Sequence, residues 1–399
     1  MHMFSAHVLI LSYVNIFGDL VSTDAFFSED TSKENSAENL SESGTRSAAS
    51  VKEEMMKKFA VNCTGLARPE QCVYNLLGTT YSRGYQFTVE ERHAIEADLK
   101  ITECMDENDT PILGCDLGRH GTKQDVRFIL WTSNSTVDNF NENHAFDGQN
   151  PTYFIFHGFF SMGTIDWIKQ AKDGLLQTKS SANVISVDWA PLASVFSSGV
   201  IGSYCSAVES IQFVAERTSE LILSLVRTRG LLPSNLHMIG HSLGAHAAGI
   251  TSKLLQTMDN GLPAVAAITG LYPAGPLFFN RNSSQKLSRE DAAYVQVIHT
   301  NGGTNTTVFK ALLTGTFGYF PPLGDDDFYP NGGVDQPGCT HKWFCDHTRA
   351  SDYWVESIES VAVSRGDASM NPAEEGISAA EPQVTEFTAT TCDSYDQFK

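Results

Sequence analysis

Short apolar segments recur along the chain from about Val61 onward, and turns rich in polar residues and glycine separate them. Unbroken apolar runs of this length are typical of strands that are buried on both faces. We predict strands at residues 126–132, 152–158, 183–190, 236–240, 264–272 and 293–300. Helical patterns lie between them, notably at 203–229 and 243–257. This alternation predicts an α/β fold with a mostly parallel central sheet and helices on both faces.

The first 60 residues follow a different pattern. Residues 1–25 hold an apolar run that is short for a membrane span and is followed by small residues, which predicts a signal peptide cleaved before Phe26. An uncleaved anchor is the alternative. Residues 26–60 are acidic and rich in serine, which predicts a disordered leader. The rest, residues 61–399, is expected to form one globular domain.

Charge and cysteine content narrow the compartment and the partners. The formal net charge of −20 argues against nucleic-acid binding and against attraction to anionic membranes. The 8 cysteines form an even set, as disulfides require. Sequons for N-glycosylation occur at Asn39, Asn62, Asn108, Asn134, Asn282 and Asn305. These features predict a secreted glycoprotein without a transmembrane segment.

Residues 236–249 read LHMIGHSLGAHAAG and contain the pattern G-x-S-x-G around Ser242. A predicted strand enters this motif and an alanine-rich helix leaves it, which is the setting of a nucleophilic serine on a sharp turn. Acyl transfer also needs two N–H donors for the oxyanion. We predict the amide of Leu243 as one donor and that of Phe159, in the stretch FIFHGFF, as the other.

A histidine late in the chain is the expected base, because the order Ser before His is that of α/β-hydrolases. His347 fits this order and is expected in a loop before a helical stretch. The other histidines near apolar segments are expected to have packing roles: His157, His241, His246 and His299.

Several stretches in combination resemble the pancreatic lipase family, especially its single-domain arthropod members. They run from about Val126 to Val363 and include HGF, NVISVDWA, HMIGHSLGAHAAG, TGLYPAGP, YVQVIHTNGG, DFYPNGGVDQPGC and CDHTRASDYWVESI. The resemblance implies an α/β-hydrolase that acts on lipid esters. It also implies the roles already given to Ser242, His347, Phe159 and Leu243.

Both carboxylates that the resemblance implies for the catalytic triad are absent. The position of the triad acid is Tyr272, and that of a backup acid one strand later is Gln296. Asp346 adjoins the base, but neighbouring side chains usually diverge. Asp291 and the run Asp325–Asp327 are expected on the solvated surface.

The resemblance also implies a lid and a metal site in defined segments. The lid would lie between Cys339 and Cys345, where Trp343 and Phe344 either touch lipid or pack internally. So short a lid favours a phospholipase A1 or a general esterase over a strict triacylglycerol lipase. In the segment where the resemblance implies calcium, only Asp291 has the required chemistry, so we predict no metal and no cofactor.

Two functions remain open from the sequence. The first is a secreted hydrolase of triacylglycerol or of the phospholipid sn-1 acyl ester, acting at a lipid–water interface. The second is a silenced homologue that binds or carries lipid, a function that the resemblance to yolk-protein relatives of the family implies. Ser242 and His347 favour the first, and Tyr272 favours the second. A structural glycoprotein has no feature in its favour. The C-terminal stretch, with Cys392, resembles one that the family continues past, which predicts truncation.

Overall fold

A computed structural model describes residues 47–60, 91, 121–193, 199–258, 261–303, 311, 315–339 and 344–364. The predicted signal peptide, most of the predicted leader and the C-terminal stretch lie outside these residues. So do Trp343, four of the predicted sequons and the cysteines at positions 63, 72, 104, 115 and 392. Within the described part, no helix combines the length and the apolar character needed to cross a membrane.

A sheet of eight strands forms the centre of the structure, in the order β10-β7-β6-β5-β3-β4-β1-β2. In chain order these strands are β1 (Arg127–Thr132), β2 (Ser135–Val137), β3 (Thr152–Phe156), β4 (Asn183–Asp188), β5 (Leu236–His241), β6 (Ala267–Leu271), β7 (Val295–Ile298) and β10 (Asp326–Phe328). Pairing is parallel from β10 to β4, and β1 pairs antiparallel with both β4 and β2. The prediction of a mostly parallel sheet is confirmed. Each predicted strand is present, with shorter bounds except for β5, which extends one residue further to His241.

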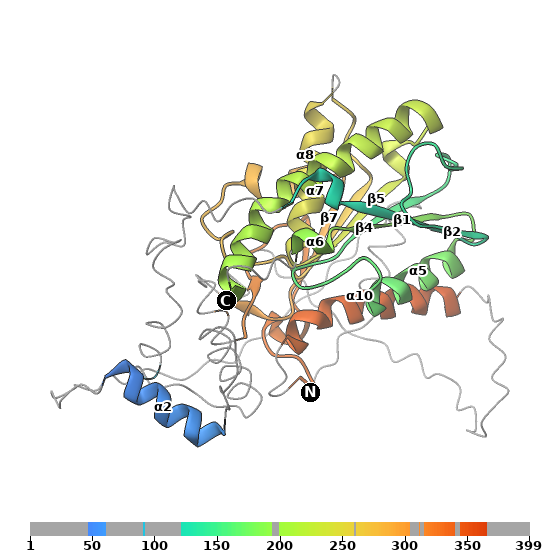
Figure 1. The fold of residues 1–399 in the computed structure, drawn as a ribbon. Coiled ribbons are helices and arrows are strands. Elements are labelled where there is room, and N and C mark those ends of the chain that lie inside the picture. Colours follow the sequence, from blue (N-terminus) through green and yellow to red (C-terminus); the bar gives the residue numbers. More distant parts are fainter. Residues whose placement is uncertain are drawn as a thin grey trace.

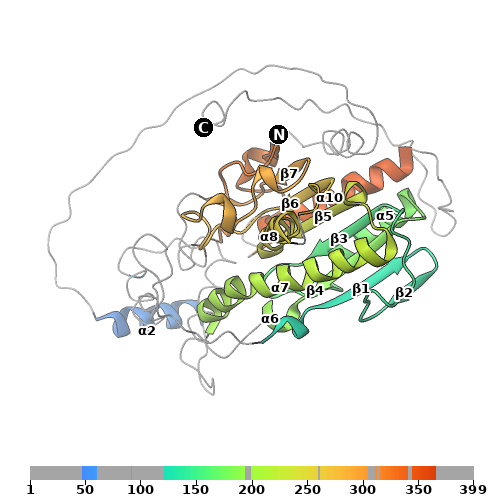
Figure 2. The same ribbon diagram turned by 90° about the horizontal axis from the view of Figure 1, so that it is seen from above.

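Helices cover both faces of this sheet (Figures 1 and 2). One face carries α7 (Gly199–Arg229) and α8 (Leu243–Thr257), and the other carries α5 (Asp166–Thr178) and α10 (Cys345–Ser364). Side chains alternate between the two layers, since Phe154 and Phe156 join one apolar cluster and Tyr153 and Ile155 join the other. This arrangement confirms the α/β-hydrolase class.

Short elements complete the described part of the chain. They are α6 (Ala190–Ala193), a small parallel pair formed by β8 (Gly302–Gly303) and β9 (Gly318–Tyr319), and the 3₁₀ helices η2 (Lys123–Asp125), η3 (Pro233–Asn235), η4 (Ser283–Gln285), η5 (Arg289–Asp291) and η6 (Pro330–Gly333).

Helix α2 (Ala48–Phe59) differs from the expectation of disorder throughout residues 26–60. Val51, Met55 and Phe59 recur every four residues and therefore lie on one side of the helix. All three side chains are buried. The Ser47 hydroxyl caps the helix by accepting a hydrogen bond from the Ser50 amide. The acidic, serine-rich composition obscured this short apolar stripe.

The register of the central strands brings four loop starts to one edge of the sheet. Phe156 pairs with Gly240, and Leu271 pairs with both His241 and Ile298. The residues that directly follow β3, β5, β6 and β7 therefore lie next to one another. The carboxyl edge of a parallel sheet is where α/β proteins hold their ligands.

A row of polar side chains crosses three of these strands inside the molecule. The Gln296 side-chain amide donates to the Thr269 hydroxyl at 2.8 Å, and His237 Nε2 lies 2.8 Å from the same oxygen. All three residues are buried. Burial lowers the pKa of His237 to about 3, so its ring is neutral and needs no countercharge.

We expect Thr269→Val to lower the free energy of unfolding by about 2–5 kcal/mol, because two buried polar groups lose a partner. Thr269→Ser keeps the hydroxyl and is the matched control. Urea denaturation measures both. Equal losses in the two variants would show that the hydroxyl is not what stabilises this row.

Candidate active site

Ser242 lies on a strained turn between β5 and α8. Its backbone angles are φ 57° and ψ −121°, a conformation that costs a residue with a side chain about 1–3 kcal/mol. The Ser242 amide donates to the Leu271 carbonyl at 3.0 Å, which ties the turn to β6. A Cβ atom on Gly244 would lie 2.5 Å from the carbonyl oxygens of Phe156 and His157, so only glycine fits there. These features give the turn the geometry that is typical of a nucleophile elbow.

The loop after β3 lies against this elbow. A Cβ atom on Gly158 would be 2.9 Å from the Ser242 Cβ. The Phe160 amide donates to the Ala193 carbonyl at 3.1 Å and fixes the far side of the loop. Within the described residues, the amides of Phe159 and Leu243 donate no hydrogen bond, so both remain able to bind an oxyanion.

His157 holds the loop after β3 in place through contacts with Trp189, which is the packing role expected from the sequence. The Trp189 amide donates to His157 Nε2 at 3.0 Å, and the Trp189 indole N–H donates to the His157 carbonyl at 2.9 Å. The two rings stack with centroids 5.2 Å apart, and the His157 side chain is fully buried. His157 therefore has no path to a substrate.

His347 lies in the first turn of α10, whereas the sequence predicted a loop. The Asp346 carboxylate stabilises this earlier helix start, since an acidic group favours a helix N-terminus. The same carboxylate accepts a hydrogen bond from the backbone amide of Gln336 at 2.6 Å. His241, next to the predicted nucleophile, contacts the carbonyl of His347 through Nε2 at 3.1 Å. His347, the predicted base, is therefore a neighbour of the turn that carries Ser242.

The imidazole of His347 is enclosed by aromatic rings. Its centroid lies 4.6 Å from that of Tyr272 and 4.8 Å from that of His241. In the described structure no hydrogen bond joins the Ser242 hydroxyl to this ring, and hydrogen bonds between a serine and its base are often long before substrate binds.

Tyr272 fills the position where the triad acid was expected. It follows β6 with a φ of 53°, and its side chain is fully buried. The Tyr272 hydroxyl donates to the Asn301 carbonyl, and its ring meets His347 at an interplanar angle of 79°. Burial raises the pKa of Tyr272 well above its ordinary value, so the phenol is neutral. It gives His347 an aromatic contact and no charge.

The lack of a carboxylate at position 272 affects Nδ1 of His347. This atom is buried and has no hydrogen-bond partner in the part of the chain that the structure describes. Burial, and next to it the neighbouring His241, lower the pKa of His347 well below its ordinary value. The ring is neutral at pH 7, with the nitrogen that a triad acid would hold left unpaired.

A sequence profile described as Lipase matches residues 111–399. The chain belongs to the lipase family. It is 32% identical over 292 residues to pancreatic lipase-related protein 2 of Cavia porcellus, covering 69% of this chain and 56% of that protein. It is 33% identical over 260 residues to pancreatic triacylglycerol lipase of Homo sapiens, covering 58% of this chain and 51% of that protein. The chain thus spans about half the length of these relatives.

Two solved structures are similar at a greater distance. The Bacillus cereus carboxylesterase shares 16% identity, with 58% of this chain and 94% of that chain covered and a TM-score of 0.29. Est1E of Butyrivibrio proteoclasticus shares 11% identity, with 60% and 95% covered and a TM-score of 0.31. At these values the two structures carry no information about the activity of this lipase-family chain.

Other carboxylates in this lipase-family chain have partners elsewhere. Asp346 accepts from the Gln336 amide, and Asp327 accepts from His299 Nε2 at 2.7 Å. Asp291 is buried and pairs with Lys253. The expectation of solvated surface is therefore wrong for Asp291 and Asp327. Asp291 pairs with Lys253, and Asp327 bonds to His299 and accepts from the amides of Leu323 and Gly324. None of the three carboxylates is hydrogen-bonded to the His347 imidazole.

Three positioning groups escaped the sequence reasoning. The side-chain Nε2 of Gln336 donates to the carbonyls of Thr300 and Pro330, each at 2.9 Å, and ties the end of β7 to the segment before α10. The Asn301 carbonyl accepts the hydrogen bond of the Tyr272 hydroxyl, and Gly318 has no side chain that would overlap the Tyr272 ring. No local pattern marks these residues, since their roles depend on contacts between distant segments.

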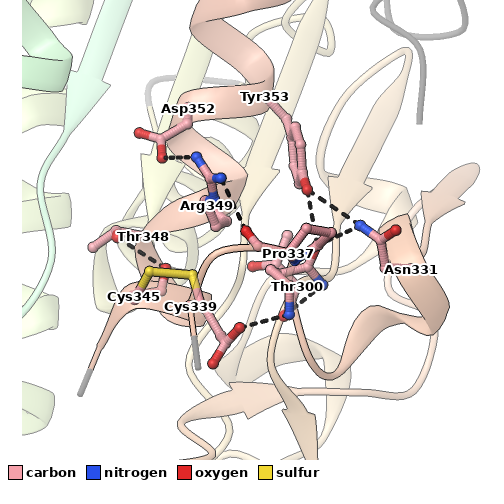
Figure 3. The surroundings of a disulfide bond; sticks show 11 residues. Thr300, Asn331, Pro337, Cys339, Cys345, Thr348, Arg349, Asp352 and Tyr353 are labelled. Atoms are coloured by element: carbon pink, nitrogen blue, oxygen red, sulfur yellow. Dashed lines mark hydrogen bonds and ion pairs between the residues drawn. A yellow bond between two sulfur atoms is a disulfide. The ribbon is translucent and has the colours of Figure 1, made fainter. Parts of the chain in front are cut away.

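A disulfide joins Cys339 to Cys345, as the resemblance implied, with Cα atoms 5.3 Å apart (Figure 3). Arg349 reaches back from α10 to the Pro337 carbonyl at 3.1 Å. Together these links hold the start of α10, and with it His347, against the rest of the site. Of the residues between the two cysteines only Phe344 is described, so the role of this loop as a lid stays a prediction.

Gly318 and Tyr272 are expected to be energetically coupled. A Cβ atom on Gly318 would overlap the phenol ring of Tyr272, so Gly318→Ala should cost about 1–3 kcal/mol of unfolding free energy. In a Tyr272→Ala background the same change should cost less than about 1 kcal/mol. Denaturation of the four proteins measures the coupling, and an equal loss in both backgrounds would contradict it.

Proposed function

We propose that this chain is a carboxylic-ester hydrolase for lipid esters, with Ser242 as nucleophile and His347 as base. The observation that carries the proposal is the strained elbow at Ser242, because the loop of Gly158 packs against it and its neighbour His241 contacts the carbonyl of His347. The names of the pancreatic triacylglycerol lipases that it resembles support a triacylglycerol or a related acyl ester as substrate.

The geometry supports a two-step acyl transfer. The Ser242 hydroxyl attacks the ester carbonyl while His347 Nε2 takes its proton and then delivers it to the departing alcohol. The amides of Phe159 and Leu243 bind the oxyanion that forms, and one such donor is worth about 10²–10³ in turnover. Water then attacks the acyl-enzyme with the help of the same histidine.

The unpaired Nδ1 of His347 predicts that this chemistry is slow. When the ring accepts the serine proton it becomes a buried imidazolium, and no carboxylate among the described residues bonds to it. Replacing the acid by a neutral group in a serine protease costs about 10⁴ in turnover, yet about 10³–10⁴ over water survives from the oxyanion hole and binding. We therefore propose an impaired rather than an absent activity.

Apolar side chains close to the site support a lipid substrate. Met162 is 54% exposed and Phe160 is 38% exposed, and both follow the loop of the oxyanion donors. Phe344 is 37% exposed, and its ring centroid lies 6.5 Å from that of His347. The six-residue spacing of the disulfide next to it favours phospholipid sn-1 esters or small esters over strict triacylglycerol hydrolysis.

The second candidate is a silenced homologue that binds or carries lipid. The buried Tyr272 favours it, because its ring fills the acid position and its hydroxyl is committed to the Asn301 carbonyl. In that case the apolar side chains around the elbow hold a lipid without cleaving it.

We also propose that the protein is secreted. The N-terminal apolar run suits a signal peptide, and the Cys339–Cys345 disulfide suits an oxidising compartment. The sequon residues Asn134 and Asn282 are both exposed and therefore accessible to glycosylation.

The first test compares hydrolysis of a soluble short-chain fluorogenic ester by the purified protein and by Ser242→Ala. We expect the unaltered chain to exceed the variant by at least about 10-fold, since the nucleophile supplies the covalent step. Equal rates at background would reject the hydrolase and leave lipid binding as the function to measure.

The second test restores the acid. Tyr272→Asp should raise kcat by roughly 10- to 10⁴-fold, because a carboxylate beside Nδ1 stabilises the imidazolium. The acid limb of kcat/KM should lie at a lower pH than an ordinary histidine would give, since burial lowers the pKa of His347. It should move to higher pH in the variant, because a nearby negative charge raises a histidine pKa.

Tyr272→Asn is the matched control, since it has the size of aspartate without the charge. Tyr272→Asn should neither raise kcat nor move the acid limb to higher pH. A gain of similar size in both variants would show that Tyr272 acts by bulk, and that the missing charge is not the limit on catalysis.

A further inference from the structure

An ammonium group lies among converging oxygen atoms between α8 and the segment that precedes β7. Lys253, on α8, donates from Nζ to the Lys286 carbonyl at 2.9 Å and to the Ser288 hydroxyl at 3.2 Å. The same nitrogen forms an ion pair with the Asp291 carboxylate. The lysine side chain is 21% exposed and that of Asp291 only 2%.

The oxygen donors belong to one short, well-ordered turn. The Asp291 carboxylate also accepts from the Ser288 amide at 2.9 Å and from the Ser288 hydroxyl at 3.1 Å. The Ser252 hydroxyl, from α8, donates to the Asp291 carbonyl. The turn 286–291 is therefore held by its own hydrogen bonds, and the positive charge that pairs with the Asp291 carboxylate comes from Lys253 on α8.

Each charge of the pair depends on the other. Burial lowers the pKa of Lys253 and raises the pKa of Asp291, and in both cases the charge of the partner opposes the effect of burial. Removing either group leaves a buried charge without compensation, which is more costly than losing an exposed ion pair.

The residues present do not fit the calcium ion that the family resemblance implies for this segment. A carbonyl, a hydroxyl and a carboxylate are oxygen donors that calcium accepts. However, the lysine nitrogen already occupies the point where they converge, and its charge would repel a divalent ion. Among the described residues, no group of three or more His, Cys, Asp and Glu side chains is arranged to hold a metal.

We propose that the Lys253 ammonium replaces a bound metal ion as the cation that holds the turn 286–291 to α8. The fold of this lipase-family chain is then independent of divalent metal. This inference concerns stability and goes beyond the proposed catalytic function.

The contacts between Lys253 and the turn 286–291 also affect the candidate active site, because they join two segments that border it. Helix α8 starts directly after Ser242, and the turn 286–291 leads into β7, whose end adjoins Tyr272 through Asn301. The Leu287 amide donates to His246 Nδ1, on α8, at 3.1 Å. The Lys253 cluster therefore helps to fix the nucleophile helix relative to the strand behind the base.

The test measures Tm in EDTA and in millimolar calcium chloride for the unaltered chain and for Lys253→Ala. The unaltered chain should show the same Tm in both. Lys253→Ala should lose roughly 5–15 °C in EDTA, because Asp291 becomes a buried unpaired charge. Calcium should return part of that loss, since the truncated side chain leaves the oxygen donors free.

Lys286→Met is the matched control, because it removes a nearby lysine that does not pair with Asp291. In the unaltered chain, Lys286 Nζ bonds to the Tyr319 hydroxyl at 2.6 Å and to the Phe278 carbonyl at 3.4 Å. Lys286→Met should lose less stability and should not respond to calcium. The proposal is overturned if EDTA or calcium shifts the Tm of the unaltered chain, a result that remains decisive if Lys253→Ala does not fold. It is also overturned if Lys253→Ala resembles Lys286→Met or ignores calcium.

Discussion

The parallel register of β3, β5, β6 and β7 is the constraint on which the site depends. Because these strands are neighbours and run in one direction, the residues after their ends share one edge of the sheet. That edge receives the loop of Phe159, the elbow at Ser242, the acid position at Tyr272 and the segment of Asn301. The same strands, buried between two helical layers, have almost no freedom to adjust, so each side chain at the edge must fit its neighbours as they are.

Tyr272 shows how that edge accommodates a phenol at the position where the family resemblance implies the triad acid. A phenol is longer than a carboxylate, and its hydroxyl passes His347 to reach the Asn301 carbonyl. Gly318 provides the space for the ring. The substitution is thus supported by its surroundings in packing and in hydrogen bonding. What it does not replace is the negative charge beside His347, and burial makes that loss larger because water cannot compensate for it.

The sequence predicted the sheet, both helical layers and the elbow, because hydrophobic period and the G-x-S-x-G setting are local signals. It also indicated which two carboxylates are missing, through the family resemblance at Tyr272 and Gln296. It failed where contacts join distant segments. Asp291 looked like a solvated acid because its partner Lys253 lies 38 residues earlier in the chain. His347 looked like a loop residue because the contact of Asp346 with Gln336 could not be seen from the local pattern.

The central claim is that Ser242 remains a reactive nucleophile although His347 lacks its acid. Covalent labelling by an alkyl fluorophosphonate tests it most directly, since phosphonylation needs the elbow, the base and the oxyanion hole but no turnover. Intact-mass and peptide mass spectrometry would report the extent and the site of modification. The account predicts slow labelling that approaches one probe per chain, located on Ser242 and absent in Ser242→Ala. No labelling of the folded protein at Ser242, at any probe concentration that labels an active lipase, would contradict it.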